Sequence, residues 1–158
     1  MRPSDPLIAA IAEQYESRFR ESLGPIRKVG REAEFPVVRP DGRAGDVHLL
    51  WEPLLAEGSI TPQYDDPETR SLIYSAQAED VVYAIEVGRG TVELSLGPCE
   101  DLWQLQARFA QAIARLGRAA RASGMLVLGF GIQPRTPPSA GLMTARRHYQ
   151  ALYRAVGT

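Results

Sequence analysis

The chain of 158 residues has one cysteine, Cys99, and this scarcity excludes an internal disulfide framework. A single thiol is typical of proteins kept in a reducing compartment. Neither sign of charge dominates, because 18 Lys and Arg residues balance 19 Asp and Glu residues to a net charge of -1. The chain therefore lacks the basic excess that holds a nucleic-acid backbone or an acidic membrane surface, and we expect neither as a partner.

Long apolar runs are also missing. No stretch of the chain approaches the roughly 20 residues that a transmembrane helix requires. The start of the chain has only a short apolar segment, LIAAIA, followed by acidic residues, which matches a secretory signal peptide poorly. The sequence contains no internal repeat, low-complexity tract or linker. We therefore expect a single cytoplasmic domain over residues 1–158, which is long enough to bury a core.

Apolar residues at helical spacing occur in several parts of the chain. They predict helices from Pro6 to about Leu23, from Asp46 to about Glu57 and from Glu100 to about Ser123. The third of these has a natural stop at Gly124 in the left-handed conformation. A last short helix is predicted to about Val156, with Thr144 as its cap. The apolar stripe of the third helix consists of Leu102, Leu105, Phe109, Ile113 and Leu116.

Other segments alternate with a period of two, which is typical of β-strands. Short turns join three of them, so these strands are expected to form an antiparallel meander. The stretch TPQYDDPETR is interpreted as a loop. The pattern as a whole predicts an α+β fold, an antiparallel β-sheet with helices packed on one face. The predicted strands are Arg27 to Val38, Ser71 to Gln77, Val81 to Val87, Thr91 to Gly97 and the run MLVLGFGI at 125–132.

The run MLVLGFGI alternates large apolar residues with smaller ones, and we expect the large ones to face the core. Val127, Gly129 and Gly131 would then face away from the core. Two glycines weaken a strand and leave room for a ligand or another backbone, although close packing of a helix explains them nearly as well. The residues expected to face the core are Leu126, Leu128, Phe130 and Ile132.

Two glutamates, Glu32 and Glu34, lie one residue apart in the first predicted strand. Their carboxylates would share one face of the sheet, roughly 7 Å apart by twice the rise per residue. Ala33 and Phe35 would point the other way, into the core. The alternative is an ordinary solvated face, because antiparallel sheets often have one wet face on which glutamates are common.

Glu86 and Glu93 flank the turn GRG, and their geometry depends on the loop. A two-residue turn at Arg89-Gly90 makes them cross-strand neighbours, about 5 Å apart at the β-carbons. A three-residue turn moves them to opposite faces. We expect the two-residue turn. Like charges directly opposite each other are destabilising unless a cation or proton lies between them, and no lysine is interleaved. The four carboxylates therefore predict a hard-oxygen site for magnesium or manganese.

An ordered set of motifs extends this interpretation. VGREAEF, EVGRGTVELSLGP, an amphipathic helix, LVLGFGIQP and LMTARRHYQALY resemble plant-type glutamate–cysteine ligases and their bacterial relatives over about Arg27 to Tyr153. The resemblance implies a glutamine-synthetase-like carboxylate–amine ligase, in which a curved antiparallel sheet holds magnesium between ATP and an amino-acid carboxylate. It also implies the reaction of glutathione biosynthesis in which γ-glutamyl phosphate and the amine of cysteine give γ-glutamylcysteine.

The resemblance also implies roles for particular residues. Glu32, Glu34, Glu86 and Glu93 match acids that ligate Mg²⁺ or Mn²⁺. Gln133 matches a residue near substrate, and Arg146 and Arg147 match a segment expected to grip an anion through guanidinium groups. A solvated helix start is the alternative for the two arginines. No side-chain nucleophile is required, so no catalytic residue is predicted, and Cys99 is interpreted as a packed small residue or part of a turn.

Enzymes of this family are more than twice this long, and the matched motifs belong to their N-terminal half. We therefore expect this chain to be the N-terminal portion of a larger ligase domain, either as a fragment, a split subunit or an inactive remnant. The alternative function is a catalytically silent binding or oligomerisation module derived from that fold. We expect that the chain alone will not form γ-glutamylcysteine at a family-like rate. Self-association or a separate C-terminal half are the expected partners besides small molecules, and the acceptor amine stays open.

Overall fold

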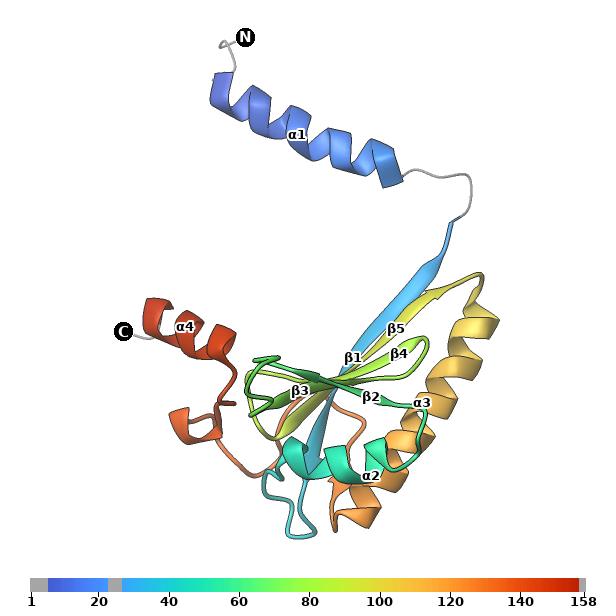
Figure 1. Ribbon diagram of the computed structural model, residues 1–158, viewed down its shortest axis with the longest axis vertical. Coiled ribbons are helices and arrows are strands. Elements are labelled where there is room, and N and C mark those ends of the chain that lie inside the picture. The colour runs from blue at the N-terminus through green and yellow to red at the C-terminus, as the bar shows by residue number, and fades with distance from the viewer. Residues whose placement is uncertain (1–5, 23–26, 157–158) are drawn as a thin grey trace.

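A computed structural model of the chain describes residues 6–22 and 27–156, without the side chains of residues 19–22. Its described strands form one sheet in the order β2-β3-β4-β5-β1-β6, and every neighbouring pair is antiparallel. Helices α2 (Trp51–Leu55) and α3 (Leu102–Ala122) cover one side of this sheet (Figure 1). The predicted α+β class is thus confirmed. The strands are β1 (Val29–Val38), β2 (Thr61–Tyr64), β3 (Ile73–Gln77), β4 (Val81–Ile85), β5 (Thr91–Cys99) and β6 (Leu126–Val127).

The core lies between the sheet and α2 and α3. On β5, Val92 and Leu94 are fully buried, whereas Glu93 between them points to the other side of the sheet. Tyr83 on β4 is also fully buried, and its hydroxyl donates a hydrogen bond to the Ala112 carbonyl of α3 at 3.2 Å. The strict alternation of these strands therefore separates an apolar face from a polar one.

Helix α3 agrees with its predicted bounds. The Asp101 side chain caps it by accepting a hydrogen bond from the Gln104 backbone N–H at 2.7 Å, and Gly124 ends it with a φ of +68°. Leu116 is fully buried, but Leu102 is 69% exposed, so its place in the predicted apolar stripe is wrong. Leu102 lies in the first turn of the helix, whereas the buried residues of α3 begin at Ala112.

The segment predicted as a loop contains strand β2, so that prediction is wrong at Thr61–Tyr64. This strand pairs only with β3, with Pro62 opposite Ala76. Proline lacks a backbone N–H, so it is tolerated on an edge strand, where one side of the backbone makes no ladder. The residues of β2 do not alternate between apolar and polar, and pairing with β3 makes this segment a strand.

Strand β6 is much shorter than the predicted strand over 125–132. Val127 lies opposite the fully buried Val37, and Leu126 lies opposite Val38. The Leu128 backbone N–H donates a last hydrogen bond to the Pro36 carbonyl, after which the chain leaves the sheet. Strand β6 is an edge strand with a two-residue ladder to β1, and this ladder does not continue through residues 129–132.

The predicted facing of this run is also wrong. Because Val127 lies opposite the core residue Val37, Val127 faces the core and Leu126 does not. Leu126, Phe130 and Ile132 are 48%, 54% and 75% exposed. A β-carbon added to Gly129 or Gly131 would meet no atom within 4 Å, so neither a packed helix nor a close backbone explains these glycines.

The segment predicted as a helix from Asp46 to Glu57 forms the 3₁₀ helix η1 (Val47–Leu50) followed directly by α2. Asp46 is its cap as predicted, since its side chain accepts a hydrogen bond from the His48 backbone N–H at 3.1 Å. A second 3₁₀ helix, η2 (Ala140–Leu142), lies in the loop that follows β6.

Helix α1 (Pro6–Ser22) is set apart from the sheet in Figure 1, and its predicted end at Leu23 lies outside the described residues. Ile8 and Ile11 on this helix are 63% and 57% exposed. None of the described helices is both long and apolar enough to cross a membrane.

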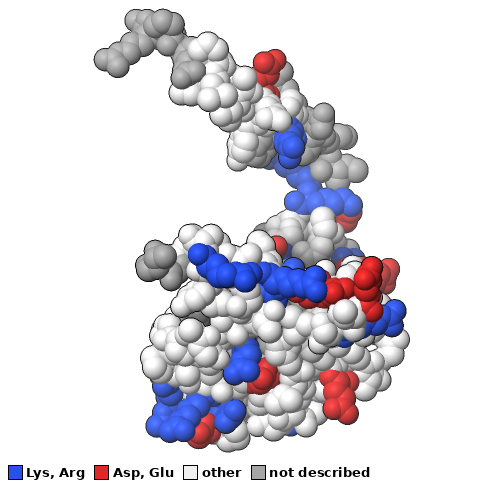
Figure 2. All heavy atoms as spheres, turned by 60° about the vertical axis from the view of Figure 1, so that its left-hand side comes forward, with Lys and Arg blue, Asp and Glu red and all other residues white. Residues whose placement is uncertain are grey.

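Helix α4 (Arg147–Val156) begins later than predicted, and Thr144 is not its cap. The Arg147 backbone N–H donates instead to the Asp65 carboxylate at 2.9 Å, from the loop between β2 and β3. The Arg147 guanidinium also pairs with Asp66 at 2.6 Å. Figure 2 shows Lys and Arg side chains adjoining Asp and Glu side chains on this side of the molecule. Carboxylates near the first turn of a helix are favourable, so these contacts fasten α4 to the sheet.

We predict that Gly90→Ala destabilises the fold. Gly90 is buried, and a β-carbon there would lie 2.6 Å from Gln133 Nε2 and 3.0 Å from the Ala44 β-carbon. The free energy of unfolding measured in urea should fall by about 1–3 kcal/mol, because overpacking forces neighbours to shift. Gly129→Ala is the matched control, and its added methyl group meets no atom within 4 Å. An equal loss of stability in both variants would contradict this account.

Candidate metal centre

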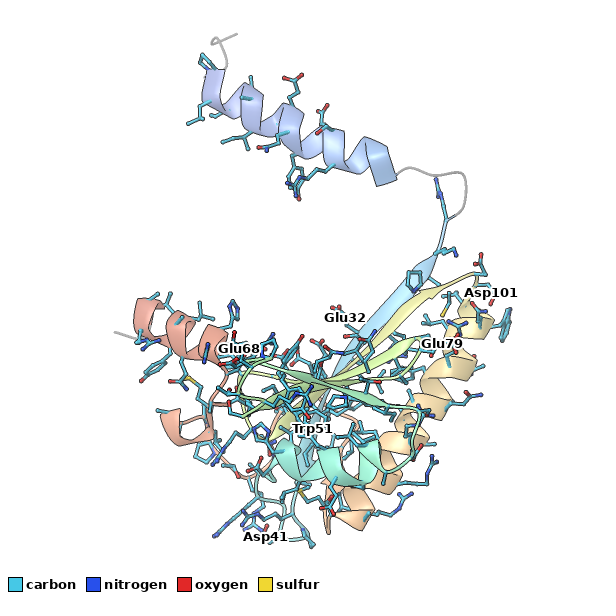
Figure 3. The ribbon with its side chains drawn as sticks, in the orientation of Figure 1. Glu32, Asp41, Trp51, Glu68, Glu79 and Asp101 are labelled. Carbon is cyan, nitrogen blue, oxygen red and sulfur yellow. The ribbon has the colours of Figure 1, made fainter. Side chains whose placement is uncertain are left out.

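Strands β1 and β5 bring three of the predicted site residues to one face of the sheet. Glu34 lies directly opposite Glu93, and Glu32 lies opposite Ser95. Strand alternation places all of them on the side that α2 and α3 do not cover. Figure 3 shows Glu32 on that side of β1. The prediction that Glu32 and Glu34 share a face is confirmed.

Glu86 also lies on this face, but it is not paired with Glu93 as predicted. Strand β4 ends at Ile85, and Glu93 lies opposite Ala84, so the direct opposition of Glu86 and Glu93 is wrong. The two-residue turn itself is present, since the Thr91 backbone N–H donates to the Gly88 carbonyl at 3.0 Å. Two residues, Glu86 and Val87, therefore lie between the end of the ladder and the turn.

A distant segment causes this departure. The Thr144 N–H donates to the Val87 carbonyl at 2.8 Å, and the Arg89 N–H donates to the Leu142 carbonyl at 2.6 Å. Gly88 and Met143 form an antiparallel bridge between these two contacts. Residues 87–89 thus pair with residues 142–144 instead of with β5, which no local pattern in the sequence reveals.

The carboxylates of Glu34, Glu86 and Glu93 nevertheless converge. Each of these three residues offers one oxygen, and the three oxygens lie within 4.8 Å of one another. Glu86 and Glu93 are half-buried, whereas Glu34 is exposed. Glu32 lies outside this group, which we call the carboxylate cluster. The structure therefore gathers three of the four predicted metal ligands.

The carboxylate cluster is electrostatically unfavourable by itself. Burial raises the pKa of Glu86 above its ordinary value, and the neighbouring carboxylates of Glu93 and Glu34 raise it further, whereas a hydrogen bond from the Val87 N–H opposes them. The Ser95 hydroxyl donates to Glu93 at 2.8 Å. None of the ion pairs found among the described residues includes a member of the cluster.

This donor set fits a hard divalent cation. Magnesium and manganese take carboxylate oxygens and usually keep several waters or substrate oxygens as further ligands. Three converging carboxylates on a sheet face without a covering helix supply the protein ligands and leave such positions open. A cation there would relieve the repulsion that raises the pKa of Glu86.

Two residues beside the carboxylate cluster were not predicted as part of it. Thr144 is fully buried, and its hydroxyl donates to the Glu86 carbonyl at 3.1 Å, so it fixes the backbone of a cluster member. The Tyr149 hydroxyl donates to the Ile85 carbonyl at 3.4 Å. Burial raises the pKa of Tyr149, and the nearby Glu86 carboxylate raises it further. Both Thr144 and Tyr149 belong to the segment LMTARRHY, in which the sequence predicts Thr144 only as a helix cap.

The two predicted anion-binding arginines already have carboxylate neighbours. Arg146 Nε lies 3.5 Å from Asp65 Oδ1, and the guanidinium stacks 4.3 Å from the Tyr74 ring centroid. Its Nε is buried and makes no hydrogen bond. Arg147 is paired with Asp66. An incoming anion would have to compete with Asp65 and Asp66, which lie in the segment predicted as a loop.

Gln133 lies away from the carboxylate cluster. Its Nε2 donates to the Gly90 carbonyl and, at 3.5 Å, to the Val37 carbonyl. The side chain thus ties the loop after β6 to the turn between β4 and β5. Its Oε1 is buried without a hydrogen-bond partner.

The comparison with known proteins identifies the family. The model of the glutamate-cysteine ligase family 2 (GCS2) matches residues 28–158. The chain belongs to this family. A search of curated proteins found no match. The resemblance drawn from the motifs is confirmed, and membership of the GCS2 family indicates a ligase of the glutamate–cysteine type. The match includes β1, β5 and the whole carboxylate cluster.

We predict that this GCS2-family chain binds Mn²⁺ through the carboxylate cluster. In calorimetric titrations, Glu34→Gln and Glu93→Gln should each weaken binding by at least about tenfold, because each removes a charged ligand. Glu32→Gln is the matched control on the same strand and face, and it should change the affinity by less than about twofold. A Glu32→Gln effect as large as the others would restore the site of four ligands predicted from sequence.

We predict that Glu86→Gln stabilises the metal-free protein at neutral pH. The pKa of Glu86 is raised in the folded state, so its contribution to stability is present below its unfolded pKa and is lost as pH rises through the folded pKa. The unfolding temperature of the variant should therefore exceed that of wild type at pH 7.5, and the difference should vanish on acidification. A lower unfolding temperature for the variant at pH 7.5 would show that the carboxylate stabilises the metal-free fold.

Proposed function

We propose that this chain carries the metal-holding part of an ATP- and Mg²⁺-dependent carboxylate–amine ligase site. The observation that carries the proposal is the convergence of Glu34, Glu86 and Glu93 on the uncovered face of an antiparallel sheet, in a chain of the GCS2 family. The proposed product is γ-glutamylcysteine, formed in the cytoplasm as a step of glutathione biosynthesis. The fold of the whole enzyme is proposed to be glutamine-synthetase-like.

Glu34, Glu86 and Glu93 would hold Mg²⁺ or Mn²⁺, and the bound ion would neutralise phosphate oxygens during phosphoryl transfer. Ser95 orients Glu93 through its hydroxyl, and the Val87 N–H holds one oxygen of Glu86. Thus two of the three ligands are directed by hydrogen bonds. Glu32 lies outside the cluster, so the ion held by these three carboxylates is proposed to bind without it.

In the proposed reaction, a γ-carboxylate oxygen of glutamate attacks the γ-phosphorus of ATP and ADP leaves. The amine nitrogen then attacks the acyl carbon, the bond to the phosphate oxygen breaks, phosphate leaves and the amine loses a proton. Arg146 and Arg147 are proposed to contact an anionic group of the substrates. Arg146 is the better placed of the two, because its buried Nε still lacks a hydrogen-bond acceptor.

A second candidate function is a catalytically silent binding or oligomerisation module. The observation that favours it is the exposure of apolar side chains, Leu126 on the edge strand β6 and Phe130 and Ile132 in the loop that follows it. Exposed apolar surface next to a strand edge invites association. Sedimentation velocity over a range of protein concentrations distinguishes a self-associating chain from a monomer.

Calorimetric titration with Mg²⁺ and a non-hydrolysable ATP analogue tests the proposed function. Wild type should bind the nucleotide only with Mg²⁺ present, and Glu93→Gln should lose at least about tenfold in affinity, because the ion then lacks one of its charged ligands. Glu32→Gln again serves as the matched control. Equal binding by wild type and Glu93→Gln would contradict the proposal.

Phosphate release in the presence of ATP, Mg²⁺, glutamate and cysteine measures turnover separately. We expect release well below a family-like rate for this chain alone. Rapid release that disappears in Glu93→Gln would contradict that expectation while supporting the ligase chemistry.

A further inference from the structure

The peptide bond between Glu86 and Val87 is held by a hydrogen bond on each of its two sides. Its carbonyl, which belongs to Glu86, accepts from the Thr144 hydroxyl at 3.1 Å. Its N–H, which belongs to Val87, donates to the Glu86 carboxylate at 3.2 Å. A trans peptide unit is planar, so its C=O and N–H point in opposite directions. Fixing this carbonyl therefore also fixes the direction of the N–H that holds the carboxylate.

Thr144 makes this contact from a backbone that is itself held. Its side chain is fully buried, and its backbone N–H donates to the Val87 carbonyl at 2.8 Å. Its own carbonyl accepts a hydrogen bond from Gln150 Nε2 of helix α4 at 3.0 Å. Because both of its backbone polar groups are bonded, the hydroxyl of Thr144 acts from a fixed position.

The other two carboxylates of the cluster depend on different contacts. Glu34 and Glu93 lie opposite each other in the β1–β5 ladder, and the Ser95 hydroxyl donates to Glu93. Glu86 lies beyond the end of β4, so the β4–β5 ladder does not include it. Loss of the hydroxyl that bonds the Glu86 carbonyl should therefore disturb one carboxylate and leave the other two in place.

We propose that Thr144 is a positioning residue for the metal site. Its hydroxyl, acting through the peptide bond between Glu86 and Val87, directs the Glu86 carboxylate toward those of Glu34 and Glu93. This inference rests on the proposed function. The alternative is that the hydroxyl only pairs a backbone carbonyl, in which case it would contribute to the stability of the fold and not to the affinity for the cation.

Calorimetric titration of the full chain with Mn²⁺ tests the inference. Thr144→Val nearly keeps the shape of the side chain and removes the hydroxyl, so Mn²⁺ binding should weaken about threefold to tenfold, the effect of one hydrogen bond. Thr144→Ser keeps the hydroxyl and should bind Mn²⁺ within about twofold of wild type. Wild-type affinity in Thr144→Val, or an equal loss in both variants, would overturn the proposal.

A double-mutant cycle with Glu86→Ala determines whether the effect passes through the Glu86 carboxylate. In the Glu86→Ala background, Thr144→Val should change the Mn²⁺ affinity by less than about twofold, because the carboxylate that the hydroxyl positions is absent. A purely structural role of Thr144 would give the same loss of affinity in both backgrounds, and that result would overturn the proposal.

Ser123→Ala is the matched control for a loss of stability. The Ser123 hydroxyl donates to the Leu49 carbonyl at 2.7 Å, so it also joins a hydroxyl to a distant backbone carbonyl, but at the C-terminal end of α3. This variant should lower the free energy of unfolding and keep the wild-type affinity for Mn²⁺. A loss of affinity equal to that of Thr144→Val would show that stability alone sets the affinity, against the proposal.

Hydrogen exchange of the wild-type protein supplies a test that needs no variant. If the pairing with Thr144 favours Mn²⁺ binding, then by linkage Mn²⁺ favours the pairing. Saturating Mn²⁺ should slow exchange of the Thr144 amide, which donates to Val87, more than that of the Leu128 amide, which donates to the Pro36 carbonyl beside β6. An equal change at the two amides would overturn the proposal.

Mn²⁺ titration of Glu93→Gln separates failure of this inference from failure of the proposed function. If Mn²⁺ binding requires Glu93 and Glu86 but is unaffected by Thr144→Val, only the positioning role fails. If wild type does not bind Mn²⁺, or if Glu93→Gln binds it equally well, the proposed metal site fails, and the positioning role fails with it.

Discussion

The backbone pairing of residues 87–89 with residues 142–144 is the contact on which the candidate site depends. It begins directly after the β4–β5 ladder ends at Ile85, and it holds the backbone next to Glu86 while the Glu86 carboxylate lies beside those of Glu34 and Glu93. Thr144 completes this pairing with a buried hydroxyl that has a hydrogen-bond partner, as a buried polar group requires. Without this contact the β4–β5 ladder would be free to continue in its observed register, in which Glu86 would lie opposite Thr91.

The carboxylate cluster lowers the stability of the fold and provides ligands for a cation. Three carboxylates held within 4.8 Å repel one another, and the protein supplies no ion pair to them among the residues described. The sheet can hold such a cluster because β1 and β5 are paired along nearly their whole length and are packed against α3. A ligand cation would convert the repulsion into attraction, which is how preorganised charge serves binding.

Strand alternation was sufficient to predict the part of the site that lies on β1 and β5. Glu32, Glu34 and Glu93 share a face because side chains alternate, and this rule needs no knowledge of distant contacts. Alternation also puts Glu86 on the face of Ala84, but its position relative to Glu93 could not be predicted, because a residue 58 positions away bonds its carbonyl. For the same reason the sequence did not predict strand β2 and predicted too long a strand at β6. Both strands depend on pairing with the neighbouring strand more than on their own sequence. The hydrogen bond from the Arg147 backbone N–H at the start of α4 to the Asp65 carboxylate could not be predicted either, because it joins residues 82 positions apart.

The separation in sequence between Glu86 and Thr144 has a consequence for how the protein folds. The meander of β3, β4 and β5 uses short turns and can form from local contacts, whereas the pairing with residues 142–144 closes a long loop that contains β5, α3 and β6. Contacts of long sequence separation form late, because the entropy of loop closure opposes them until the rest of the structure is in place. Contacts outside the central ladder open more readily than the core strands. The amide hydrogens of Arg89 and Thr144, which donate across this pairing, should therefore exchange with solvent sooner than those of the β1–β5 ladder. The geometry of the carboxylate cluster should therefore persist for a shorter time than the fold that supports it.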